Sequence, residues 1–162
     1  MYRTYMESEI GLLEINGTEN GIEEVLFVKE KRCPAAGEAP SILTDCALQL
    51  EEYFEGKRKT FDVKLNMQGS DFRKSVWNEL LLIPFGKTVS YSYIAGKLGD
   101  LKKVRAVGAA NGKNRLAIIV PCHRIIGSNG DLTGYAGGLW RKEWLLLHEG
   151  VEIKGKEQME LF

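Results

Sequence analysis

The chain has 162 residues and carries 22 basic and 22 acidic side chains, so its formal net charge at neutral pH is zero. This length suits one compact domain or two small ones that share a core. No unbroken apolar run is long enough to span a bilayer, and the first residues lack the apolar core of a signal peptide. We therefore expect a cytoplasmic protein that does not enter a membrane.

The cysteines give no sign of a disulfide framework or a metal site. Cys33, Cys46 and Cys122 form an odd set with no close pair, which is typical of free thiols in a reducing compartment. Zinc motifs place paired ligands a few residues apart, and these cysteines have no such partners. The sequence therefore predicts no metal and no other cofactor.

The first part of the chain is predicted to be a sheet followed by a helix. Residues 2–28 alternate apolar and polar side chains and are interrupted by Asn-Gly pairs at 16–17 and 20–21, which are strong hairpin signals. Ser41 is placed to cap a helix that runs through Phe54 and stops at Gly56. An extended piece at 60–65 leads to a polar boundary at 66–69. We expect an antiparallel β-meander and one helix in a supporting domain, residues 1–68.

The second part, residues 69–162, is predicted to be mainly helical. Ser70 caps a helix that Pro84 ends. Ser90 or Ser92 caps a short helix, Gly99 turns the chain, and a third helix runs from about 101 to 110. This is a helix-turn-helix pattern, which is weak evidence on its own because many helix pairs look the same. Together the two parts predict an α+β fold.

Positive charge is concentrated between Gly86 and Gly127. This segment holds eight basic residues and a single acid, Asp100, and so carries a net charge of plus seven. The remainder of the chain balances it with a net charge of minus seven. Binding to a polyanion depends on local patches rather than on total charge, so the segment is compatible with a nucleic-acid partner, although a charge run is more often a solvated face.

A candidate nucleophile follows the apolar run 116–120. We expect this run to be a buried strand, because Pro121 stops it and fixes the backbone just before Cys122. His123 can take the thiol proton and Arg124 raises the local positive potential, and both favour the nucleophilic thiolate. A buried structural thiol is the alternative, since free cysteine packs as a small hydrophobe.

The third predicted helix combines small residues with one long polar side chain, Arg105. A face of small residues lets a helix backbone approach a narrow surface, and a lone arginine there can enter a base stack as minor-groove proteins do with wedge residues. Tight helix packing through alanine and glycine explains the same composition. Both interpretations stay open on this evidence.

Several segments occur in an order and spacing that is typical of a known family. They are Val89-Ser90-Tyr91, Arg105-Ala106-Val107-Gly108, Asn114, Pro121-Cys122-His123-Arg124, Thr133-Gly134-Tyr135-Ala136-Gly137-Gly138 and residues 142–150. On these segments the chain resembles, over nearly its whole length, the O6-alkylguanine-DNA alkyltransferases, also called methylated-DNA-protein-cysteine methyltransferases. The resemblance implies a ribonuclease H-like sheet with a helix in residues 1–68 and a winged-helix-like domain in residues 69–162.

The resemblance also implies an activity in DNA repair. The protein would be a monomer that binds double-stranded DNA through the minor groove and flips an alkylated guanine out of the duplex. It would then transfer the alkyl group irreversibly and stoichiometrically to its own Cys122. O4-alkylthymine would be a second substrate.

Residue roles follow from the resemblance position by position. Cys122 matches the acceptor nucleophile, His123 the base that takes its proton through a bound water, and Glu149 the carboxylate that orients this histidine. Tyr91 matches the proton donor to the leaving guanine, and Arg105 the finger that fills the space of the flipped base. The remaining predicted roles are DNA contacts at Tyr91, Lys102, Ala106, Gly108, Arg115 and Arg124, pocket walls at Val120, Tyr135, Ala136 and Gly137, and support of the active-site segment at Asn114.

Two other functions fit the residues less completely. A binding module that recognises the lesion and recruits other repair factors would leave Cys122 unreactive, but the related lesion binders carry tryptophan at that position. A cysteine hydrolase using Cys122 and His123 would turn over and need no basic segment, but catalytic cysteine and histidine usually come from separate segments. We rank the alkyltransferase first.

Overall fold

The computed structural model describes residues 1–32 and 38–153, so Cys33 lies outside the described residues. The chain divides into two compact units. The first contains Met1–Gly69 and Arg115–Ile119, and the second contains Ser70–Asn114 and the chain from Val120 onward. The predicted α+β class is confirmed. The assignment of a supporting role to residues 1–68 and a DNA-binding role to 69–162 stays a prediction.

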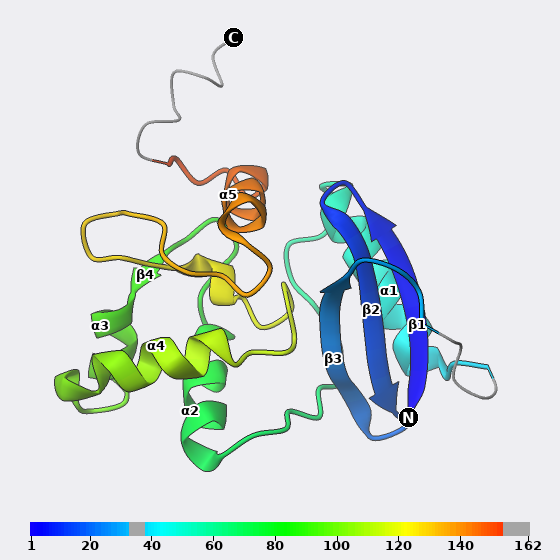
Figure 1. Ribbon diagram of the computed structural model, residues 1–162, viewed down its shortest axis with the longest axis horizontal. Helices are drawn as coiled ribbons and strands as arrows, with labels where there is room; N and C mark the ends of the chain where they lie inside the picture. The colour runs from blue at the N-terminus through cyan, green and yellow to red at the C-terminus, as the bar shows by residue number, and fades with distance from the viewer. Residues whose placement is uncertain (33–37, 154–162) are drawn as a thin grey trace, which may run out of the picture. The chain divides into compact units, whose positions relative to one another are not determined.

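The first unit is built on the predicted three-stranded meander. The strands are β1 (Tyr2–Ser8), β2 (Gly11–Thr18) and β3 (Gly21–Val28), antiparallel in the order β1-β2-β3, and the helix α1 (Ser41–Phe54) lies across one face of the sheet (Figure 1). Gly21 opens β3 with a φ of 141°, and a Cβ on it would lie 3.0 Å from the backbone of the neighbouring segment at Leu65 and Asn66. Only glycine combines this backbone angle with so close an approach.

The core of the first unit lies between α1 and the sheet. Leu43, Cys46 and Leu50 of α1 and Leu13 and Ile15 of β2 are fully buried. Pro40 occupies the N-cap position of α1, so the prediction that Ser41 caps this helix is wrong by one residue. Proline fits this position because its fixed φ matches the observed value of −63° and it has no N–H that would need a partner.

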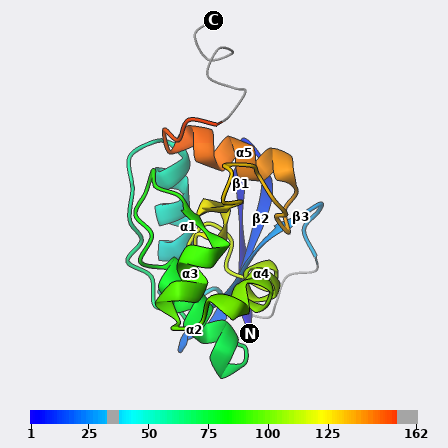
Figure 2. The same ribbon diagram turned by 90° about the vertical axis from the view of Figure 1, so that its left-hand side faces the viewer.

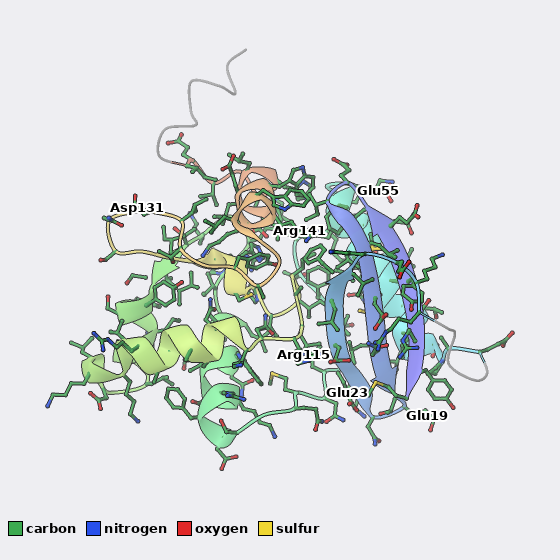
Figure 3. The ribbon with its side chains drawn as sticks, viewed as in Figure 1. Glu19, Glu23, Glu55, Arg115, Asp131 and Arg141 are labelled. Atoms are coloured by element: carbon green, nitrogen blue, oxygen red, sulfur yellow. The ribbon has the colours of Figure 1, made fainter. Side chains whose placement is uncertain are left out.

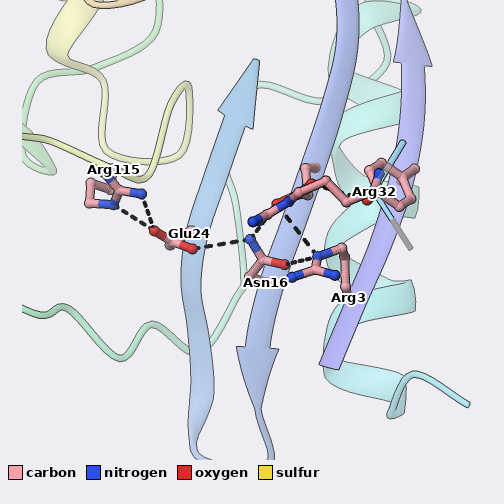
Figure 4. A network of polar contacts seen from close by, with 7 residues as sticks. Arg3, Asn16, Glu24, Arg32 and Arg115 are labelled. Atoms are coloured by element: carbon pink, nitrogen blue, oxygen red, sulfur yellow. Dashed lines mark hydrogen bonds and ion pairs between the residues drawn. The ribbon is translucent and has the colours of Figure 1, made fainter. Parts of the chain in front are cut away.

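A polar cluster covers the opposite face of β2, because side chains alternate between the two faces of a strand. Glu14 is fully buried there and accepts hydrogen bonds from Arg32, Asn16 and Tyr5 (Figure 4). The hydrogen bond from Arg32 is the largest cause that lowers the pKa of Glu14 to about 2, against burial, which raises it. The carboxylate is therefore charged and satisfied, as a buried charge must be.

The outer edge of β3 is covered by two short extended pieces of chain. Ile22 forms a parallel bridge with Leu65, and Val25 forms one with Leu116. Val25 donates its N–H to Arg115 O at 2.8 Å and accepts at its carbonyl from Ala117 N at 3.1 Å. The edge of the sheet therefore has hydrogen-bond partners from its own unit.

The predicted buried strand at 116–120 is wrong. Leu116 alone makes a bridge, and Ile118 then adopts a φ of 71°, in the left-handed region that β-branched residues rarely occupy. The N–H of Ile119 donates to Ala117 O at 2.8 Å, which closes a three-residue γ-turn around Ile118. The run is apolar because it forms a buried turn. A short apolar run does not by itself distinguish a buried strand from a buried turn.

The second unit is mainly helical and contains the predicted helix-turn-helix (Figure 2). Its short strands β4 (Val89–Ser90) and β5 (Ile125–Ile126) pair in parallel, with Val89 opposite Ile125. The elements are α2 (Asp71–Leu80), β4 (Val89–Ser90), α3 (Tyr91–Lys97), the 3-10 turn η1 (Leu101–Lys103), α4 (Val104–Gly112), the 3-10 turn η2 (Cys122–Arg124), β5 (Ile125–Ile126) and α5 (Leu139–His148).

Local side-chain chemistry sets the boundaries of these helices. Ser70 accepts a hydrogen bond from Arg73 N at the start of α2, and Ser90 accepts one from Tyr93 N at the start of α3. Gly99 has a φ of 86° and turns the chain after α3. Both predicted serine caps and the glycine turn are confirmed. Among the described helices, none combines the length and apolar character needed to cross a membrane.

Candidate active site

Cys122 is held by tight turns rather than by the end of a strand. Pro121 has φ −80° and ψ 63°, and the N–H of Cys122 donates to Val120 O at 2.7 Å, which closes a second three-residue turn. Asn114 Nδ2 donates to the same carbonyl at 2.9 Å. The thiol at the start of η2 is buried, with 6% of the residue exposed.

Burial raises the pKa of the Cys122 thiol above its ordinary value, although Asn114 and the charge of Lys142 act in the opposite direction. The thiol is therefore protonated at neutral pH and needs a base before it can act as a nucleophile. The sequence predicted that His123 and Arg124 favour the thiolate, whereas the buried thiol in the structure favours the protonated form. The reason is desolvation, which disfavours a buried anion.

His123 is fully buried, and its ring is oriented by Glu149. Nε2 of the ring lies 2.7 Å from Glu149 Oε2. Burial lowers the pKa of His123, so the imidazole is neutral and its Nε2–H donates to the carboxylate. The other nitrogen, Nδ1, is buried and has no hydrogen-bond partner among the described residues. This arrangement leaves a lone pair on Nδ1 that can accept a proton.

Glu149 is held as a carboxylate by several donors. Arg124 donates to it through Nε at 2.8 Å and Nη2 at 3.0 Å, and Gly86 N donates at 3.1 Å. Burial raises the pKa of Glu149, but the hydrogen bonds from His123 and Arg124 and the charge of Arg124 outweigh burial and hold this pKa well below its usual range. The carboxylate can therefore stabilise positive charge on His123.

Arg124 does not lie where its predicted DNA contact requires. Besides its two bonds to Glu149, its Nη1 donates to Ile83 O at 2.7 Å, and the residue is only 6% exposed. A buried, fully paired guanidinium cannot reach a phosphate on the surface. Its position instead explains how the buried carboxylate is neutralised.

A cavity of about 230 Å³ opens beside Cys122 in the second unit. The ring of Tyr91 forms one wall and packs against α4, where a Cβ on Gly108 would lie 3.8 Å from the ring. Two buried polar atoms of wall residues, Asn111 Oδ1 and the Tyr135 hydroxyl, have no partner among the described residues. The lining residues are Tyr91, Gly108, Asn111, Gly112, Cys122, Gly134, Tyr135 and Ala136.

The loop 127–138 supplies the wall opposite α4, and its outer bend carries Asp131 (Figure 3). The phenol oxygen of Tyr91 lies 2.7 Å from Thr133 Oγ1. Lys142 Nζ donates to Thr133 O at 2.6 Å, and Arg141 Nη1 donates to Gly137 O at 2.9 Å. The loop is therefore fixed to α3 at one point and to α5 at two.

The predicted pocket residues are only partly brought together. Tyr135 and Ala136 line the cavity, whereas Val120 and Gly137 do not. Val120 is fully buried, and its contribution is the carbonyl that accepts from Asn114 and Cys122. Sequence reasoning assigned no role to the lining residues Asn111, Gly112 and Gly134; the spacing of Asn111 three residues after Gly108 on one helix was a signal that could have identified it.

The predicted DNA contacts lie in different places. Lys102, Arg105 and Ala106 are exposed on η1 and α4, in the second unit. Arg115 is exposed too, but it belongs to the first unit and forms an ion pair with Glu24 (Figure 4). In residues 1–32 and 38–153 no three His, Cys, Asp or Glu side chains are grouped so that they could hold a metal ion.

Comparison with known proteins agrees with this geometry. Residues 71–151 match the family model described as 6-O-methylguanine DNA methyltransferase, DNA binding domain, and residues 1–67 match the ribonuclease-like domain of the same methyltransferases. The chain belongs to this family. A methylated-DNA–protein-cysteine methyltransferase of Methanosarcina acetivorans is 49% identical over 93% of this chain and 99% of its own length. The one of Mycolicibacterium paratuberculosis is 44% identical over 91% of both chains.

Solved structures of this methyltransferase family show the same fold. The crystal structure of the Mycobacterium tuberculosis O6-methylguanine methyltransferase superimposes with a TM-score of 0.81 at 41% identity, covering 91% of this chain and 92% of the other. The M. tuberculosis OGT in complex with DNA superimposes with a TM-score of 0.83 at 41% identity, covering 92% of each chain. The predicted family resemblance is confirmed.

Proposed function

We propose that this chain is a methylated-DNA–protein-cysteine methyltransferase that repairs O6-alkylguanine in double-stranded DNA by moving the alkyl group to its own Cys122. One observation carries the proposal: the thiol borders a cavity and is followed in the chain by a neutral imidazole that a buried carboxylate orients. The names of the relatives, and the DNA in the complex of the M. tuberculosis protein, support the substrate and the partner.

The chemistry begins with the thiol proton. His123 takes it at Nδ1 through a bound water, and Glu149 stabilises the resulting imidazolium. The Cys122 thiolate then attacks the alkyl carbon, so the carbon–sulfur bond forms as the bond from carbon to guanine O6 breaks. Tyr91 gives its phenol proton to the leaving guanine. The flipped base must enter the cavity for this, because the alkylated oxygen cannot be reached inside a stacked duplex.

The product limits each molecule to one reaction. A thioether is not a group that water displaces, so Cys122 is not regenerated. The protein is therefore consumed stoichiometrically, and we propose that O4-alkylthymine reacts in the same way.

DNA binding is assigned to the helix-turn-helix of the second unit. Arg105, exposed on α4, fills the space of the flipped base, while Ala106 and Gly108 let α4 approach the minor groove. Lys102 neutralises phosphate. Asn114 supports the turn that presents Cys122. We propose that the protein acts as a monomer in the cytoplasm and that Arg115 contributes less to DNA binding, since it is paired with Glu24.

The decisive test is the intact mass of the protein after incubation with a duplex that carries one O6-methylguanine, followed by peptide mapping. The expected result is a gain of one methyl on Cys122, capped at one equivalent per protein and absent in Cys122→Ser. Methyl on the buried Cys46 instead would contradict the assignment of the nucleophile. Tight binding of the lesion with no change in mass would replace the proposal with a lesion-binding module.

A further inference from the structure

Thr133, in the loop 127–138, is hydrogen-bonded to side chains of α3 and α5. Its hydroxyl lies 2.7 Å from the phenol oxygen of Tyr91, on α3. Its carbonyl accepts from the ammonium of Lys142, on α5, at 2.6 Å. Neither Thr133 nor Lys142 takes part in the reaction as described above.

Lys142 is an unusual anchor because its side chain is fully buried. Burial lowers the pKa of Lys142 to about 8, while the interaction with Cys122 raises it. A buried ammonium without a hydrogen-bond acceptor would destabilise the folded protein. The hydrogen bond from Lys142 to the Thr133 carbonyl is therefore needed in the folded state. The main chain of Thr133 is therefore fixed before any substrate enters.

We propose that Thr133 is the positioning residue for the Tyr91 phenol and that Lys142 fixes Thr133 in this role. The inference rests on the proposed function, in which Tyr91 protonates the leaving guanine. The threonine hydroxyl then has a role in the reaction, in addition to any role in packing.

The proton count on the phenol defines this task. A phenol has one proton, so Tyr91 can give it to the guanine only if its oxygen accepts, rather than donates, in the contact with Thr133. Thr133 O–H then donates to the phenol oxygen and directs the phenol proton into the cavity. When that proton passes to the guanine as the bond from carbon to O6 breaks, the same Thr133 O–H stabilises the phenolate that remains. Solvent returns a proton to Tyr91 afterwards.

The test uses two substitutions that differ in one group. Thr133→Val removes the hydroxyl and keeps the branched shape, whereas Thr133→Ser keeps the hydroxyl. Single-turnover transfer from duplex O6-methylguanine gives a maximal rate and a half-saturating DNA concentration. We expect Thr133→Val to lower the maximal rate about tenfold, the effect of one hydrogen bond, and Thr133→Ser to restore it to within about twofold. The half-saturating concentration should change less than about twofold in both.

A double substitution tests whether Thr133 acts through Tyr91. In a Tyr91→Phe background Thr133→Val should cause no further loss, because the phenol oxygen is already gone. A further tenfold loss there, a wild-type rate for Thr133→Val alone, or a Thr133→Ser as slow as Thr133→Val would each overturn the inference while wild-type transfer to Cys122 proceeds. Absence of transfer in the wild-type protein would overturn the proposed function, and this inference with it.

Discussion

At the scale of single residues, the site solves a conflict between burial and reactivity. Burial raises the pKa of Cys122 and lowers that of His123, so both groups are neutral in the resting protein. Proton transfer between them creates two charges inside the protein, which low dielectric disfavours. Glu149 compensates the imidazolium, and Lys142 is the cation that acts on the thiolate.

Replacing Lys142 tests this compensation directly. Lys142→Met keeps the apolar part of the side chain and removes the charge that lowers the pKa of Cys122. The thiolate should therefore form at higher pH, which the ultraviolet absorbance of the thiolate measures as the free protein is titrated. Lys87→Met, at an exposed lysine of the same unit, is the control and should leave the titration unchanged. Coinciding curves for Lys142→Met and the wild type would show that the charge of Lys142 does not lower the pKa of Cys122.

Arg124 and Ile118 show why the contacts and conformations of residues were harder to predict than the motif that contains the candidate nucleophile. The motif around Cys122 predicts the proposed nucleophile and its histidine, since these are neighbours in the chain. The partner of Arg124 is Glu149, 25 positions away, and no local pattern distinguishes an exposed arginine from one that neutralises a buried carboxylate. The turn at Ile118 was equally hidden, because the apolar composition of residues 116–120 satisfies a strand and a buried turn alike.

At the scale of elements, α4 carries two residues to which we assign different roles. Arg105 is exposed on it, and Gly108 is where it meets the Tyr91 ring and lines the cavity. The caps at Ser70 and Ser90 and the turn at Gly99 were predictable because these residues act on their own neighbours, whereas the predicted cap of α1 was wrong by one residue. The cavity was predicted only in part: Tyr135 and Ala136 line it, but the residues that α4 contributes depend on a loop that follows this helix by more than ten residues.

The role of Arg105 depends on whether the substrate is stacked in a duplex. Arg105→Ala should slow repair of duplex O6-methylguanine by about tenfold or more, because the vacated base position is then unfilled. Reaction with the free O6-alkylated base should change little, since no flipping is needed. Lys113→Ala, at an exposed lysine just after α4, is the control for general loss of charge. Equal loss on both substrates would contradict the finger role.

A substitution at Gly108 is expected to change both the stability of the protein and the volume of the cavity. Its backbone is helical, and an added Cβ would lie 3.8 Å from the Tyr91 ring, which is ordinary contact. Gly108→Ala should therefore raise the free energy of unfolding by about 0.5–1 kcal/mol while narrowing the cavity. Transfer of a benzyl group should slow more than transfer of a methyl group. Gly96→Ala in α3, away from the cavity, should gain stability without this dependence on alkyl size.

At the scale of the whole molecule, acid sensitivity is built into both units. Glu14 in the first unit and His123 and Glu149 in the second have pKa values below their ordinary ones. Below those ordinary values, about 6.5 for histidine and 4.5 for glutamate, the unfolded chain binds more protons than the folded protein. The stability that these three groups contribute is therefore fully present above about pH 6.5 and is lost as the pH decreases.

Urea unfolding at a series of pH values measures this loss. The free energy of unfolding should decline first below about pH 6.5, as His123 is protonated in the unfolded chain, and again below about pH 4.5, from the two glutamates. His123→Asn should remove the first decline and keep the second. A wild-type protein that gains stability between pH 6.5 and 5 would contradict the buried neutral state of His123.

The segment that covers the outer edge of β3 determines whether the first unit can be produced as a separate fragment. Residues 115–117, which cover this edge, follow α2, α3 and α4 in the sequence. The first unit is therefore compact in space but is made of two separate segments of the chain. A fragment that ends at Gly69 would leave the N–H and C=O of Val25 unpaired on a free strand edge, which is a template for pairing with other chains. Such a fragment would aggregate, whereas the intact chain protects this edge with a segment that also leads into Cys122.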